Sequence, residues 1–72
     1  MKKTKKIKII LNGKSRSLQK TTSVYDLMRS LKLSSDKVAI ELNLKIIDKK
    51  KLNKKILKKD DKIEIVHFIG GG

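Results

Sequence analysis

Residues 62–72 have the sequence KIEIVHFIGGG, in which an alternating apolar pattern is followed by three glycines. The alternation predicts a strand over residues 62–68. Its two isoleucines, Ile63 and Ile65, share one face, which we expect to contact a helix. Val66 and Phe68 share the opposite face with a glutamate. Because these two apolar side chains would lie on the solvent side of a sheet, they form a candidate surface for a partner.

The glycines that follow predict a flexible tail over residues 69–72. Glycine has no Cβ, so this segment could extend into a slot too narrow for a side chain. The α-carboxylate of Gly72 is ionised at neutral pH. Another protein's active site could activate it with ATP as an acyl-adenylate, which would then accept sulfur or an amine. The alternative is a frayed terminus or an expression remnant, since chain ends are often disordered.

Composition limits the chemistry that the chain could perform by itself. Its 72 residues predict one domain, residues 1–72, with residues 1–5 as a basic N-terminal extension. There is no cysteine, which excludes disulfides and thiolate chemistry. The single histidine, His67, has no serine, cysteine or carboxylate pattern around it, and no second metal ligand lies near it in sequence. We therefore expect no catalytic residue, no metal site and no bound cofactor.

The formal net charge of +13 would attract nucleic acid or acidic proteins. However, only Arg16 and Arg29 among the twenty basic residues are arginine, and the only aromatic residues are Tyr25 and Phe68. Base recognition favours arginine, and single-strand binding favours aromatic side chains. A solvated lysine-rich surface is therefore favoured, with a small basic RNA-binding domain as the alternative. No segment resembles a cleavable leader or a membrane span, which predicts a soluble cytoplasmic protein.

The first half of the chain predicts a hairpin followed by a helix. Alternation predicts strands over 5–11 and 15–19, and the Asn12-Gly13 dipeptide between them favours a tight hairpin turn. Ser23 is a good N-cap, and Asp26 can complete a capping box. A single apolar stripe at helical spacing follows the cap and predicts a core face. Its members are Val24, Leu27, Met28 and Leu31.

The second half predicts further strands joined by basic segments. Alternation indicates a third strand over 38–42 and a short fourth segment over 45–47. The lysine-rich residues 48–55 are expected to form an exposed, loosely structured connection. Ile56 and Leu57 are expected to anchor the chain before a turn at 58–62.

This order of elements predicts one mixed sheet of four to five strands packed on one helix. A right-handed connection would place the last strand parallel to the first. The predicted class is therefore α+β, with the β-grasp (ubiquitin-like) arrangement.

Several segments carry a resemblance to a known family: residues 11–13, 22–28, 38–43 and above all 63–72. Over about residues 7–72, the chain resembles the ubiquitin-like sulfur carriers of thiamine biosynthesis, the ThiS family. The resemblance implies that an E1-like enzyme adenylates Gly72 with ATP and that a cysteine desulfurase or sulfur relay makes it a thiocarboxylate. Thiazole synthase would then consume the sulfur. It also implies a place at partner interfaces for Val66, Phe68 and Ile69, and passage through enzyme channels for Gly70 and Gly71.

Three positions depart from the family pattern. Leu44 stands where a hairpin glycine is usual, Asp48 where proline is common, and residues 59–61 replace an Asp-Gly-Asp turn. The last change predicts a positive φ at Asp60. Two related functions remain open from the sequence: a molybdopterin-type sulfur carrier, which shares the fold and the Gly-Gly end, and a ubiquitin-like protein conjugator.

Overall fold

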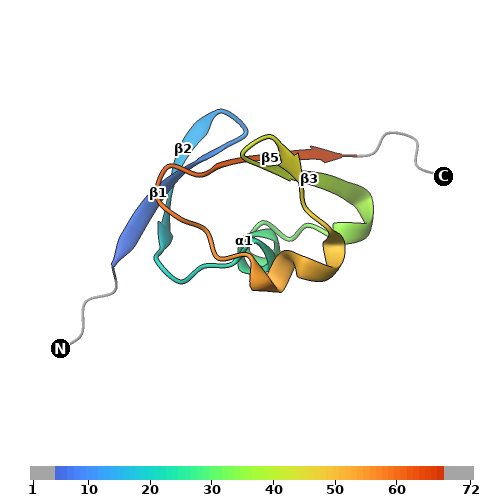
Figure 1. The fold of residues 1–72 in the computed structure, drawn as a ribbon, viewed down its shortest axis with the longest axis horizontal. Coiled ribbons are helices and arrows are strands. Elements are labelled where there is room, and N and C mark those ends of the chain that lie inside the picture. The colour runs from blue at the N-terminus through green and yellow to red at the C-terminus, as the bar shows by residue number, and fades with distance from the viewer. Residues whose placement is uncertain (1–4, 68–72) are drawn as a thin grey trace.

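The computed structural model describes residues 5–67, which form a five-stranded sheet with one α-helix. Phe68, most of the predicted N-terminal extension and the predicted tail lie outside the described residues. Figure 1 shows the sheet on one side of the molecule and α1 on the other. The elements in chain order are β1 (Lys6–Leu11), β2 (Lys14–Gln19), α1 (Val24–Ser30), the 3₁₀ helix η1 (Ser35–Lys37), β3 (Val38–Leu42), β4 (Lys45–Ile46), the 3₁₀ helix η2 (Lys49–Lys54) and β5 (Lys62–His67).

The last strand in sequence occupies the centre of the sheet, whose order is β2-β1-β5-β3-β4. On one side β5 pairs parallel with β1, with Lys62 opposite Ile10. On the other side it pairs antiparallel with β3, with Val66 opposite Ala39. The mixed sheet and the parallel neighbour of the last strand confirm the predicted topology.

The hairpin between β1 and β2 turns through two residues in the left-handed region. Asn12 has φ 49° and Gly13 has φ 82°. Positive φ at both central positions is the requirement of a type I′ turn, whose twist matches that of the paired strands. The hairpin predicted from the Asn-Gly dipeptide is confirmed.

A capping box starts α1. The Ser23 side chain accepts a hydrogen bond from the Asp26 backbone N–H at 3.0 Å, and the Asp26 carboxylate accepts one from the Ser23 backbone N–H at 3.1 Å. This reciprocal pair satisfies two N–H groups of the helix start. The helix packs its apolar stripe on the sheet, where isoleucines, leucines and valines dominate the core. Buried core residues are Ile9, Val24, Leu27, Met28, Val38, Ile40, Ile47, Leu52, Leu57, Ile63 and Ile65.

The expectation of a loosely structured connection over 48–55 was wrong. Asp48 caps η2 by accepting the Lys50 backbone N–H at 2.9 Å. Leu52 is buried, with 3% of its surface exposed, and η2 packs against α1. One buried leucine among lysines creates no repeating apolar pattern. The sequence pattern therefore did not predict this short 3₁₀ helix.

The predicted anchor over residues 56–57 was half correct. Leu57 is buried, whereas Ile56 is about half exposed. Ile56 forms an isolated bridge with Ser23, and successive side chains of an extended segment point in opposite directions. Only one of the two neighbours can therefore enter the core.

Candidate functional site: the outer face of the sheet and the hollow beside β4

Val66 lies on the face of β5 that points away from α1, and it exposes 53% of its surface. Its partner across the β3–β5 ladder is Ala39, which is half-buried. The next outward pair along the ladder is Glu64 with Glu41. The predicted solvent face of the last strand is thus confirmed for Val66, and its role at a partner interface stays a prediction.

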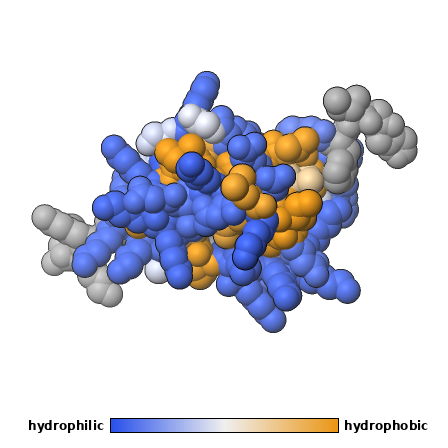
Figure 2. Space-filling view, turned by 45° about the horizontal axis from the view of Figure 1, so that its top comes forward, coloured by the Kyte–Doolittle hydropathy of each residue, from blue (hydrophilic) through white to orange (hydrophobic). Residues whose placement is uncertain are grey.

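Sequence reasoning missed a second apolar contribution to this surface, from β4. Ile46 pairs with Glu41 and exposes 74% of its surface, whereas the next residue, Ile47, is buried. Figure 2 shows hydrophobic residues interrupting the hydrophilic surface on the half of the molecule where the described chain ends. The alternation rule applied to residues 45–47 would have identified Ile46 as the outward member.

Two asparagines in separate turns hold β5 in position. The side-chain oxygen of Asn12 accepts the Ile65 N–H at 2.8 Å. The side-chain oxygen of Asn43 accepts the Lys62 N–H at 2.9 Å, and its amide donates to Asp61 at 3.0 Å. Both inward residues of β5, Ile63 and Ile65, are buried. The strand leading toward the C-terminal residues is therefore fixed by side-chain hydrogen bonds as well as by its two neighbouring strands.

The predicted site residues at the C-terminus lie beyond this strand. Phe68, Ile69, Gly70, Gly71 and Gly72 fall outside the described residues, so the structure does not place them.

His67 is exposed at the end of β5, where it pairs with Val38. Among residues 5–67, no group of three or more His, Cys, Asp or Glu side chains could hold a metal ion. The part of the chain that the structure describes has no helix long and apolar enough to span a membrane.

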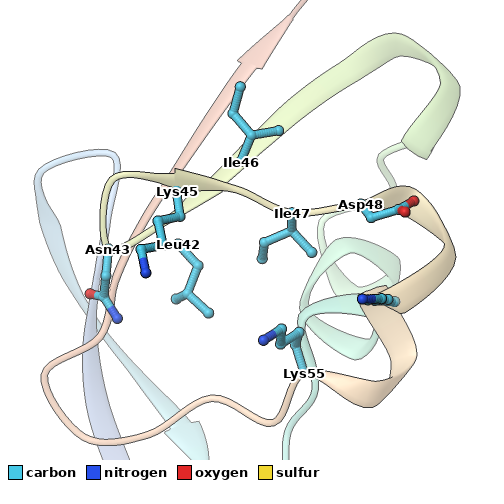
Figure 3. A pocket seen from close by; sticks show the side chains of 8 residues that line it. Leu42, Asn43, Lys45, Ile46, Ile47, Asp48 and Lys55 are labelled. Atoms are coloured by element: carbon cyan, nitrogen blue, oxygen red, sulfur yellow. The ribbon is translucent and has the colours of Figure 1, made fainter.

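A hollow of about 460 Å³ lies between the β3–β4 turn and η2 (Figure 3). Leu42 at the end of β3 and Ile47 directly after β4 point into it. Lys55 points into it from the opposite side, and Ile46 points away from it. The sequence pattern did not identify this hollow, because its lining comes from separate segments. The residues that line it are Leu42, Asn43, Lys45, Ile46, Ile47, Asp48, Lys51 and Lys55.

Comparisons with known proteins agree with this geometry. The crystal structure of a thiamine biosynthesis protein (ThiS) from Geobacter metallireducens superposes with a TM-score of 0.79 at 26% identity, covering 92% of this chain and 100% of that one. This match confirms the predicted β-grasp fold. The sulfur carrier protein ThiS of Bacillus subtilis is 43% identical over 63 residues, which are 86% of this chain and 96% of that protein.

Longer proteins also contain a similar segment. Thiazole synthase of Magnetococcus marinus is 38% identical over 66 residues, or 92% of this chain, and the chain spans 20% of the length of that relative. The model of the ThiS family matches residues 9–72, which is most of the sequence. The chain therefore belongs to the ThiS family, as its sequence pattern predicted.

Proposed function

We propose that this chain is a sulfur carrier in thiamine biosynthesis that delivers sulfur to thiazole synthase. The observation that carries the proposal is the family match, which extends from residue 9 through Gly72. The relative named sulfur carrier protein, similar over nearly its whole length, supports the same role. Thiazole synthase is favoured as the acceptor because proteins of that name contain a segment similar to this chain.

The proposed chemistry takes place at the carboxyl group of a chain that ends at Gly72. An E1-like enzyme joins a carboxylate oxygen to the α-phosphorus of ATP, and pyrophosphate leaves. The outer sulfur of a persulfide, supplied by a cysteine desulfurase or a relay, then attacks the acyl carbon, and AMP leaves. A second thiol attacks the inner sulfur of the resulting acyl disulfide, so that a disulfide forms on the sulfur donor and the acyl group keeps one sulfur. The product is a thiocarboxylate, whose sulfur thiazole synthase incorporates into the thiazole ring. The partners supply the catalysis, and this chain supplies the acyl group.

The described fold supports this division of labour. β5 is fixed at the centre of the sheet and ends at His67, five residues before Gly72. At roughly 3.3–3.6 Å per residue, five residues reach at most about 18 Å from the folded body. Glycines 70 and 71 would pass through a narrow enzyme channel because they have no side chain. Val66, together with Phe68 and Ile69, would contact the enzyme surface around that channel.

Intact-mass spectrometry tests the proposal directly. The full chain is incubated with ATP, a sulfur source and the activating enzyme of either the thiamine or the molybdopterin branch. We expect the mass increase of one oxygen-to-sulfur exchange with the thiamine-branch enzyme. The same product with only the molybdopterin-branch enzyme would refute the assignment to thiamine and support the related carrier.

Deletion of Gly72 is the matched control. It should abolish thiocarboxylate formation and leave the thermal unfolding transition unchanged, because glycine has no side chain and the buried core of the described residues lies within residues 9–65. A large loss of stability in the deletion variant would instead give the C-terminal residues a structural role. RNA binding that survives this deletion and weakens steeply with salt would favour the basic RNA-binding alternative.

A further inference from the structure

The turn between β3 and β4 exposes the two most solvent-accessible large apolar side chains of the described residues. Leu44 exposes 84% of its surface and Ile46 exposes 74%. They flank Lys45, which begins the edge strand β4. Both aliphatic side chains lie at one edge of the sheet, and neither gains the stabilisation that burial would provide. Such a pair indicates a surface that another molecule covers.

The backbone of this turn also departs from what leucine favours. Asn43 has φ 52° and Leu44 has φ 72°, both in the left-handed region. Asparagine tolerates this region, whereas leucine is destabilised there by its Cβ. Leu44 therefore combines an unfavourable backbone with an unburied side chain, and neither property contributes to the stability of the fold. Such local strain is concentrated at functional sites.

The hollow behind the turn adds positive charge to this apolar edge. Its strand side is aliphatic, from Leu42 and Ile47, and three lysines line it: Lys45, Lys51 and Lys55. The only carboxylate in the lining, Asp48, accepts the Lys50 backbone N–H as the cap of η2. The hollow thus offers ammonium groups beside an apolar wall.

The combination of groups identifies the class of partner. RNA would satisfy the lysines, but its phosphate backbone offers nothing apolar to Leu44 and Ile46. Among residues 5–67, Tyr25 is the only Phe, Trp or Tyr residue that could stack on a base. An acidic protein segment satisfies both requirements, with carboxylates on the lysines and an apolar side chain against the aliphatic groups.

We propose that Leu44, Ile46 and the lysines at 45, 51 and 55 form a docking surface for an acidic protein segment that carries apolar side chains between its carboxylates. This surface, the β4 docking surface, lies on the edge strand and is separated from β5 by β3. None of its residues takes part in the acyl chemistry proposed for Gly72.

Amide chemical-shift mapping on the full chain tests the proposal. The probe is a blocked heptapeptide of alternating aspartate and leucine, and its control replaces every aspartate with asparagine. We expect salt-sensitive shifts confined to residues 42–47 and 49–55 with the acidic peptide, and much smaller shifts with the control. Absence of shifts at residues 42–47, or equal shifts with both peptides, would overturn the proposal. Tighter binding of an oligouridine RNA to the same residues would overturn the choice of a protein partner.

Matched variants separate specific docking from general charge attraction. The triple variant K45Q/K51Q/K55Q should bind the acidic peptide about tenfold more weakly, because exposed ion pairs each contribute modestly. The variant K8Q/K14Q/K20Q removes the same charge from exposed lysines elsewhere and should bind nearly normally. L44S/I46S should also weaken binding while leaving the thermal transition in place, since both side chains are exposed. Equal losses in the two lysine variants would show that only net charge matters.

Discussion

Replacing Leu52 with alanine tests whether η2 is part of the folded core. Leu52 exposes only 3% of its surface, whereas the other residues of η2 are exposed. Removing a buried leucine costs the lost transfer free energy plus the cavity that remains, which is about 2–5 kcal/mol. A chain of this length has a total stability of about 4–11 kcal/mol. The substitution should therefore remove a large share of the free energy of unfolding, about 3 kcal/mol.

Urea denaturation followed by far-ultraviolet circular dichroism measures this loss, since the chain has no tryptophan to serve as a fluorescence probe. With a slope of about 1–1.5 kcal/mol per molar urea, the midpoint should fall by about 2–3 M. Leu44→Ala is the matched control, because the same atoms are removed from a side chain that is 84% exposed. It should change the free energy of unfolding by less than about 0.5 kcal/mol. If Leu52→Ala were as mild as Leu44→Ala, residues 49–54 would be the loose connection that their composition suggests.

Three further substitutions test the turns and the helix cap. Gly13→Ala should lower the free energy of unfolding by about 1–2 kcal/mol. Because φ of Gly13 is +82° and no atom lies within 4 Å of an added Cβ, the cost is backbone strain alone. An unchanged urea midpoint would contradict a left-handed residue at this position. Leu44→Gly should raise the melting temperature by a few degrees. The substitution removes about 1–2 kcal/mol of backbone strain at the left-handed position, whereas the greater freedom of glycine in the unfolded chain costs only about 0.5–1 kcal/mol. A lower melting temperature would mean that the leucine stabilises the turn. Ser23→Ala should cost about 1 kcal/mol in thermal unfolding by removing the N-cap acceptor, and a neutral effect would show that the capping box is energetically unimportant.

The turn and the helix start that were predicted correctly from sequence depend on residues close together in the chain. The Asn12-Gly13 turn needs only two residues that accept positive φ, and the helix start needs only Ser23 and Asp26 three positions apart. The positive φ expected at Asp60 is also present, at 70°. At Leu44 the backbone is left-handed as well, although leucine disfavours that region, so the turn geometry does not depend on glycine.

The features that escaped prediction depend on contacts between distant segments. Leu52 is buried because η2 packs against α1, and nothing in its lysine-rich surroundings carries that information. The hollow beside β4 exists only where Leu42 and Ile47 face Lys55 across a gap between separate segments. Residues 68–72, on which the proposed chemistry depends, are outside the described structure, so their roles rest on sequence and family alone.

The central position of β5 has a consequence for biosynthesis. The strand that joins β1 to β3 is synthesised after the other described strands, so a chain that stops before Lys62 has two separate strand pairs and no sheet between them. Without Ile63 and Ile65, the apolar face of α1 also loses a large part of its cover. Products truncated before Lys62 should therefore remain unfolded and open to proteolysis, so the native state forms only after β5 has been synthesised.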